Sequence, residues 1–231
     1  MRNKETKYGK RKMKKLLLII LFTGMSAEIA ISAFAFENGD LQFWNTESIE
    51  KKVNEKLKLK VEEELRLGGD MTELYYLHTD IGVSYNVTEG LDFGLNYRQV
   101  SEKKDEEWKQ ENRPHGNITF KGTWQGIKIS DRNRFELCCP EEKDDKWRYR
   151  NKISFVFPWK WTKFNIQPYS ADEVFVDFHG DKLTRNRLYS GINAELLKYL
   201  KTDIFYLWEL NKKDKNWTYN NVIGVKANIS F

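Results

Sequence analysis

A strict alternation of apolar and charged residues constrains the fold of this chain more than any other feature. In the segment "KLKLKVEEELRLG", residues 56–68, the apolar side chains are Leu57, Leu59, Val61, Leu65 and Leu67, and the charged residues at even positions fall between them. A period of two places alternate side chains on opposite faces of a sheet, whereas in a helix these leucines would scatter around the axis. The segment is therefore predicted to be a strand with one apolar and one charged face.

The same alternation recurs along the chain, and no segment after residue 35 has the uncharged apolar run that a membrane helix requires. We count about eleven strand-like segments: 41–53, 55–67, 74–87, 91–100, 110–121, 127–138, 147–157, 164–176, 183–195, 201–210 and 217–231. Two-faced strands of this kind are typical of barrels whose apolar face meets lipid and whose polar face lines the lumen. The predicted fold is an all-β, antiparallel transmembrane β-barrel of about 10–12 strands.

The strand count raises a question of parity. Bacterial barrels usually have an even number of strands, with both chain ends on the periplasmic side. Counting back from Phe231 leaves segment 41–53 without a partner strand on its amino-terminal side. Either ten strands close the barrel and 41–53 lies elsewhere, or 41–53 joins the wall and the amino end enters the lumen.

Three short segments place two cations on the same strand face: "DRNR", "YRNK" and "TRNR", which begin at Asp131, Tyr149 and Thr184. We interpret this face as lumenal, because the planar fork of Arg binds carboxylates from neighbouring strands bidentately. The predicted lumen network is Glu62, Glu64, Arg66, Asp80, Arg98, Glu111, Arg113, Arg132, Arg134, Glu136, Arg148, Arg150, Lys152, Glu173, Arg185 and Arg187. It forms either a packed ionic core that holds the barrel shape or a lumen that selects an anionic solute.

All eight tryptophans fall at or near predicted strand ends: Trp44, Trp108, Trp124, Trp147, Trp159, Trp161, Trp208 and Trp217. Indole side chains prefer the membrane interface, which is apolar on one side and wet on the other. We therefore expect them to form the interfacial aromatic belts. The connections are predicted to alternate between tight turns, such as "PWKWT" near Pro158, and long charged loops near Lys104, Lys143 and Lys213.

The amino end has the pattern of a secretory signal peptide. Basic residues precede the apolar run "LLLIILF", residues 16–22, and a small-residue stretch ends at Ala35. The predicted division is a signal peptide over 1–35 and an outer-membrane barrel domain over 36–231. Residues 1–35 hold eight of the 39 basic and two of the 34 acidic residues, so the mature chain has 31 basic and 32 acidic residues. This near-neutral balance gives no reason to expect a nucleic-acid partner.

The carboxyl end, "VKANISF", alternates to a terminal Phe231 and is similar to the C-terminal signal of bacterial outer-membrane barrels. The expected location is the bacterial outer membrane, and the expected partners are outer-membrane lipid, the barrel-assembly machinery through the last strand, and a small solute in the lumen.

Longer stretches carry a family resemblance that covers the whole mature chain. They are "DLQFW" (40–44), "EEELRLG" (62–68), "LYYLHTDIGVSY" (74–85), "GLNYRQV" (94–100), "WKQENRPHGNI" (108–118), "SDRNRFE" (130–136), "WRYRNK" (147–152), "PYSADEVFVDF" (168–178) and "NRLYSGI" (186–192). Together they resemble the bacterial family catalogued as domain of unknown function 2490. The resemblance implies an outer-membrane β-barrel without an established activity. The adjacent Cys138 and Cys139 in "ELCCP" depart from the family pattern.

Three polar residues do not fit the alternation. It points Asp131, Asn133 and Asn151 outward near mid-strand, where a bilayer would surround them. A β-bulge that shifts the phase is one explanation. The other is a polar interface with a second subunit or with lipid headgroups.

Residues with catalytic potential are few. His78 and Asp80 share a predicted lumenal face, His115 lies on another strand, and Ser84 and Ser130 are the available hydroxyl nucleophiles. Neither metal-ligand spacing nor a phosphate-binding glycine loop is present in the sequence, so no cofactor and no metal are expected. The two cysteines can pair, stay free or cross-link chains.

Three functions from different classes follow. The first is an integral outer-membrane barrel that is a narrow, porin-like channel or a structural protein. The second is an outer-membrane hydrolase, directed at lipid or peptide, that uses His78, Asp80 or His115. The third is a soluble periplasmic barrel that binds a ligand inside.

Overall fold

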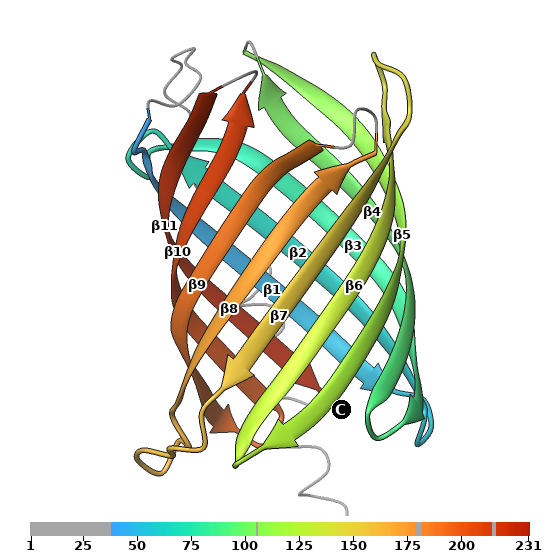
Figure 1. The fold of residues 1–231 in the computed structure, drawn as a ribbon, viewed down its shortest axis with the longest axis vertical. Coiled ribbons are helices and arrows are strands. Elements are labelled where there is room, and N and C mark those ends of the chain that lie inside the picture. Colours follow the sequence, from blue (N-terminus) through green and yellow to red (C-terminus); the bar gives the residue numbers. More distant parts are fainter. Residues whose placement is uncertain (1–37, 105, 179–181, 214–215) are drawn as a thin grey trace, which may run out of the picture. The chain divides into compact units, whose positions relative to one another are not determined.

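The structure is a computed structural model that describes residues 38–104, 106–178, 182–213 and 216–231. It contains eleven strands that close into one barrel in sequence order (Figure 1). Their bounds are β1 (Leu41–Lys52), β2 (Leu57–Gly68), β3 (Glu73–Thr88), β4 (Leu91–Lys104), β5 (Glu107–Trp124), β6 (Ile127–Pro140), β7 (Lys146–Val156), β8 (Gln167–Asp177), β9 (Lys182–Leu197), β10 (Leu200–Lys213) and β11 (Asn216–Ser230). The predicted fold class, an all-β barrel of about 10–12 strands, is confirmed.

The first and last strands close the barrel side by side in parallel. Leu41 of β1 pairs with Asn221 of β11, and Glu50 pairs with Ser230, whereas every other neighbouring pair is antiparallel. The first strand therefore belongs to the wall, which excludes the ten-strand alternative. An odd strand count follows directly from the parallel pair, because strands joined by hairpins must alternate in direction.

The parallel closure separates the two ends of the described chain. Asn38 accepts a hydrogen bond from the Tyr219 amide at the β10–β11 hairpin. Phe231 lies at the opposite end, where its carbonyl accepts a hydrogen bond from the Lys52 amide. We call these the N-terminal end and the C-terminal end of the barrel; they are the top and the bottom of Figure 1.

The connections differ from the sequence expectation. The charged segments at the N-terminal end mostly extend the strands: β4 runs to Lys104 and β5 starts at Glu107. The longest connection between strands is 157–166, at the C-terminal end, where a tight turn was expected. The charged segments that were predicted to be loops continue the paired strands instead, because their residues alternate as in a strand. Gln125 and Gly126, with φ of 49° and 83°, make a two-residue hairpin turn whose twist suits antiparallel strands.

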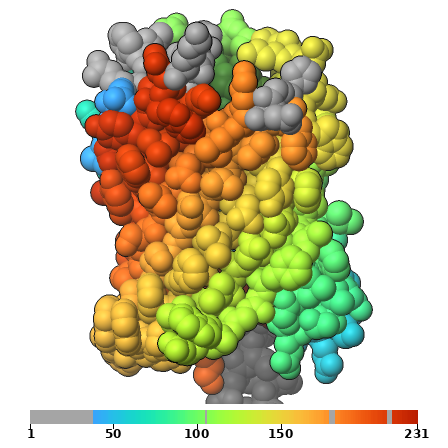
Figure 2. All heavy atoms as spheres, in the orientation of Figure 1, coloured from blue at the N-terminus to red at the C-terminus, as the bar shows by residue number. Residues whose placement is uncertain are grey.

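Most long charged side chains of the strands lie inside the barrel, and most large apolar side chains lie outside. Leu95 and Ile81 on the outer face are 69% and 56% exposed, whereas Glu136 and Glu173 inside are 0% and 1% exposed. In Figure 2, β6 to β9 cross the visible face diagonally and their outward side chains cover it. The apolar faces of most predicted strands thus form the outer surface of the wall. Across the described ranges, no helix is long and apolar enough to cross a membrane.

Candidate functional site: the charged interior

The sixteen residues of the predicted lumen network all occupy inward positions of the barrel wall, in register with their neighbours. These residues lie on eight strands, β2 to β9. The interior of an eight-stranded barrel is just filled by ordinary side chains, and this barrel of eleven strands is wider. The network forms two clusters and a stack.

The first cluster centres on Arg150 of β7. Its two terminal nitrogens donate to Glu136 Oε1 at 2.7 Å and to Glu173 Oε1 at 2.8 Å. Arg132 also donates to Glu173 at 2.7 Å, and Arg134 donates to Glu136 at 3.3 Å. The basic–Asn–basic segments therefore supply three guanidiniums to two carboxylates that are almost inaccessible to water, which makes these pairs short and strong.

The second cluster contains the residues with catalytic potential. Arg98 donates to Asp80 at 2.8 Å, and His115 Nε2 lies 3.6 Å from the same carboxylate. His78 lies 3.4 Å from Glu62 and contacts the Tyr76 hydroxyl at 3.2 Å. The structure therefore brings His78, Asp80 and His115 together, as members of a buried ion network.

The serines do not join them. In the part of the chain that the structure describes, neither Ser84 nor Ser130 hydrogen-bonds to a histidine, and His78 and His115 are both buried. An acyl-transfer site needs a nucleophile within hydrogen-bond reach of its base and access for the substrate. In the described ranges this cluster lacks a serine nucleophile within reach of its histidines, although Glu62, Asp80 and Arg98 line the interior cavity.

A stack of two guanidiniums and an indole crosses the lumen nearer its N-terminal end. The Arg66 guanidinium lies 3.6 Å from the Trp44 ring centroid, and that of Arg187 lies 4.7 Å from it. Arg66 pairs with Glu64 and Arg187 with Glu209, each at 2.6 Å. The stack joins β2 to β9, which are four places apart in the wall.

Trp44 corrects one sequence prediction. It was expected at the membrane interface, but it points inward and is 3% exposed. It shares its strand face with Gln42 and Thr46, so its alternation phase is lumenal. The other seven tryptophans are exposed, at 37% or more. Sequence reasoning also missed Glu209 and Asp177, which are inward partners of Arg187 and Arg148.

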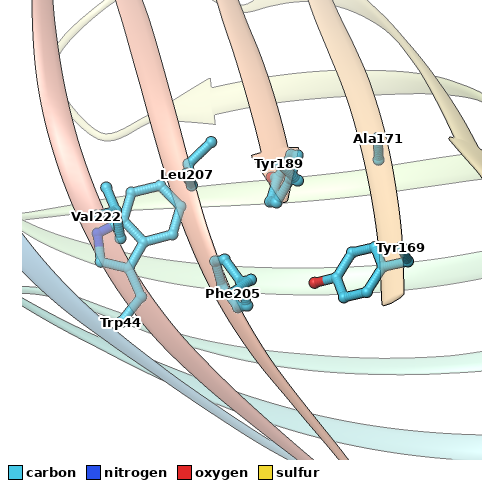
Figure 3. Packing of buried hydrophobic residues seen from close by; sticks show 7 residues of the cluster. All are labelled: Trp44, Tyr169, Ala171, Tyr189, Phe205, Leu207 and Val222. Carbon is cyan, nitrogen blue, oxygen red and sulfur yellow. The ribbon is translucent and has the colours of Figure 1, made fainter. Parts of the chain in front are cut away.

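One side of the lumen is apolar. Trp44 packs with Leu207, Val222, Phe205 and Tyr189, and the cluster continues to Tyr169 and Ala171 on β8 (Figure 3). Gly224 makes room for this cluster, since a Cβ there would lie 2.0 Å from the Phe205 ring. The barrel interior is thus mainly charged over β2–β7, whereas over β8–β11 and β1 an aromatic cluster lies beside charged residues such as Arg187 and Glu209.

A cavity of about 370 Å³ lies between these two parts of the interior. The Trp44 stack forms its inner boundary, and its lining includes ten Lys and Arg but five Asp and Glu. Lys60 and Lys201, whose side chains are 38% and 59% exposed, lie on its side nearer the C-terminal end. The cavity is therefore a basic chamber that opens toward the end of the barrel where Phe231 lies.

The outward polar residues form a network of their own on the outer wall. Asn151 donates to Asp131 at 2.5 Å and to Asn133 at 3.2 Å, and the Tyr149 hydroxyl donates to Asn133 at 2.5 Å. The β6–β7 ladder runs through these residues without a register shift. The bulge explanation is therefore wrong, and the polar residues face outward because the alternation is regular.

Cys138 and Cys139 are both free in the structure. Adjacent residues of a strand point to opposite faces, so Cys138 is buried inside while Cys139 is partly exposed. Among the described residues, no group of three or more His, Cys, Asp or Glu side chains could hold a metal ion.

The fold and its interior define a class: closed all-β barrels with an apolar exterior and an ionic interior. The sequence profile described as "Protein of unknown function (DUF2490)" matches residues 41–220. The chain belongs to that family. Among solved structures it is similar to LpxR from Salmonella typhimurium, with 6% sequence identity, 75% of this chain and 83% of that chain covered, and a TM-score of 0.47. No curated protein matches it.

Proposed function

We propose that this chain is an integral β-barrel of the bacterial outer membrane whose lumen is closed to free diffusion. The observation that carries the proposal is the stack of Arg66, Trp44 and Arg187 across the interior. Each guanidinium is held by a carboxylate at 2.6 Å, so the stack has no freedom to swing aside without breaking an ion pair. A barrel closed in this way serves as a structural element rather than as an open pore.

The membrane location rests on the distribution of side chains. Large apolar residues such as Leu95, Ile81 and Phe120 are exposed on the outer wall, and an apolar surface of that extent is costly in water. A soluble ligand-binding barrel would have the reverse arrangement. The predicted signal peptide over 1–35 would export the chain, and the last strand with Phe231 would be the segment that the assembly machinery receives.

Single-channel recording in a planar bilayer tests the closure. The mature wild-type protein, shown to be folded by its heat-modifiable migration on gels, is expected to give no discrete steps. Trp44→Ala removes the indole that both guanidiniums contact and is expected to give small, anion-preferring steps, because the lining is rich in Lys and Arg. Stepwise conductance from the wild type, or silence from a folded Trp44→Ala, would contradict the proposal.

The hydrolase alternative has one observation in its favour, the approach of His115 to Asp80 at 3.6 Å. Asp80 is already engaged by Arg98 and by Asn96, at 2.8 Å each, which leaves it as a structural acceptor. We therefore assign these residues to the ionic interior. Alanine at His115 is expected to lower resistance to unfolding; unchanged stability would favour the catalytic alternative.

A further inference from the structure

Two lysines inside the barrel have no carboxylate partner. Lys152 of β7 and Lys226 of β11 both line the cavity. Their cross-strand neighbours are Glu173 and Asp203, respectively. Glu173 accepts hydrogen bonds from Arg132 and Arg150 instead, and Asp203 accepts one from Asn193. Neither lysine forms an ion pair with any of the described residues, in contrast to the arginines of the same interior.

The two unpaired ammonium groups converge on one aromatic side chain. Lys152 Nζ lies 3.7 Å from the Tyr189 ring centroid, and Lys226 Nζ lies 6.0 Å from the same centroid. Lys226 also lies 5.3 Å from the centre of the Phe205 ring. Contacts with aromatic faces attract a cation but leave its positive charge uncompensated. The chamber therefore concentrates two positive charges against an aromatic wall.

Arg132 adds an unused donor beside them. Its terminal nitrogen binds Glu173 at 2.7 Å, but its Nε is buried without a hydrogen-bond partner in the described structure. Buried donors and charges without partners are costly, and such groups usually mark a place where another molecule supplies the partner. The Arg132 Nε requires an acceptor, and the two unpaired ammonium groups in the same chamber favour an acceptor that carries negative charge.

The chemistry of the chamber defines a class of ligand. A phosphate monoester carries about two negative charges at neutral pH, which matches two ammonium groups, whereas a carboxylate would balance one. The aromatic wall formed by Tyr189 and Phe205 offers a surface for an apolar substituent on the ester. The volume of about 370 Å³ lies within the range of roughly 300–1,000 Å³ that small-molecule sites occupy.

We propose that the chamber binds a phosphate monoester, with the phosphate between Lys152 and Lys226 and its apolar group against Phe205 and Tyr189. The ligand enters from the C-terminal end of the barrel, toward which the chamber opens. This goes beyond the proposed function, which concerns only the passage of ions through the lumen. The chamber can bind a ligand whether or not the lumen conducts ions past the Trp44 stack.

Titration calorimetry with phenyl phosphate on the folded mature protein in non-ionic detergent tests the site. Lys152→Met and Lys226→Met each remove one charged contact and are expected to weaken binding about tenfold or more. Lys201→Met is the matched control, because it removes a charge from the same lining that already pairs with Glu195 at 3.3 Å. It should change the affinity less than about twofold.

Two further probes separate the components of the ligand. Inorganic phosphate lacks the apolar group and should bind more weakly than phenyl phosphate. The second probe is competition by lipid. Binding of phenyl phosphate is measured with vesicles that contain phosphatidic acid and with vesicles of phosphatidylcholine alone. Competition identifies a lipid headgroup as the source of the phosphate, and its absence identifies a soluble ester.

Three results would overturn the proposal: no heat of binding with the folded wild type, equal affinity in all variants, or equal loss in the Lys201→Met control. Thermal unfolding without ligand gives an independent check. Because Lys152 has no carboxylate partner, Lys152→Met should unfold at the same or a higher temperature. Lower stability with unchanged binding would mean that the lysine serves only to support Tyr189. Conductance is measured separately, so its outcome does not decide this test.

Discussion

The guanidinium of Arg66 lies 3.6 Å from the centre of the Trp44 ring and 4.1 Å from that of Tyr76, while its Nε donates to Glu64 at 2.7 Å. One side chain thus contacts two aromatic rings and hydrogen-bonds a carboxylate at the same time. A planar guanidinium can do this, whereas the compact ammonium of lysine cannot. The closure proposed for the lumen therefore depends on arginine at this position and not merely on positive charge.

Replacing Arg66 by lysine should destabilise the barrel by about 1–2 kcal/mol, the size of a desolvated cation–π contact. Urea unfolding from vesicles, followed by tryptophan fluorescence, measures the change. The matched control is Arg113→Lys, since Arg113 is also inward and pairs with Glu111 at 2.6 Å but stacks on no aromatic ring of the described residues. An equal loss in both variants would show that the stack adds nothing to the ion pair.

Glu136 makes a second prediction possible. It is fully buried and accepts hydrogen bonds from Arg150 at 2.7 Å and from Arg134 at 3.3 Å. Glu136→Gln keeps the shape but removes the charge, which leaves buried guanidiniums undercompensated at a cost of about 3–5 kcal/mol. Refolding yield and the urea midpoint report this loss.

The control for Glu136 is Glu107→Gln, which removes an exposed partner of Lys109 at the N-terminal end and should leave the midpoint unchanged. The double variant Glu136→Gln/Arg150→Gln should recover part of the loss, because it removes the uncompensated charge as well. Additive losses in the double variant would refute coupling between the two residues.

The period-two pattern was enough to predict the strands and to place sixteen charged residues in the interior, because burial of one face fixes the phase of each strand. It could not predict partners. Glu136 and Arg150 are 14 residues apart and meet across a ladder, and which cation takes which carboxylate depends on side-chain packing in three dimensions. The pattern also could not predict how the barrel closes, because the parallel β1–β11 pair joins residues that are 180 positions apart in the sequence.

Trp44 shows a different kind of failure. The alternation of β1 places Trp44 on the same face as Gln42 and Thr46, which is the inner face. The prediction of an interfacial position relied instead on its place near the end of the strand. Asp131 and Asn133 show the reverse: their outward phase was correctly read, and no bulge intervenes. In both cases the regular alternation of the strand predicted the side-chain direction better than residue type did.

The outer polar network gives a third prediction. Asp131 accepts hydrogen bonds from Asn151 at 2.5 Å and from Asn133 at 3.3 Å. Asp131→Leu alone removes one partner from two amides and should cost about 1–3 kcal/mol. Replacing Asp131, Asn133 and Asn151 together by leucine removes all three and should restore or raise stability in lipid.

Urea midpoints in vesicles of one thickness measure both variants of this patch, with Asn45→Leu on the outer face of β1 as a control for added apolar area. If the triple variant folds well in detergent but fails to assemble into the membrane, the patch contacts another molecule there. If Asp131→Leu alone is stabilising, the hydrogen bonds of the network contribute nothing.

The parallel closure predicts where the two chain ends lie. With Phe231 on the periplasmic side, as is usual for bacterial barrels, the other end of the barrel faces outward, and Asn38 lies there beside Tyr219. An epitope inserted directly before Asn38 should therefore bind antibody on intact cells, whereas one placed after Phe231 should bind only after the cells are permeabilised.

An epitope near Lys143, in the connection between β6 and β7 at the same end as Asn38, serves as the positive control and should behave like the amino-terminal tag. Labelling of the carboxyl tag on intact cells would show that the barrel has the opposite orientation, with Phe231 at the cell surface. Labelling of neither end, with Lys143 accessible, would mean that the amino end turns back into the lumen, because a chain that starts at the outer rim can be hidden only by entering the barrel.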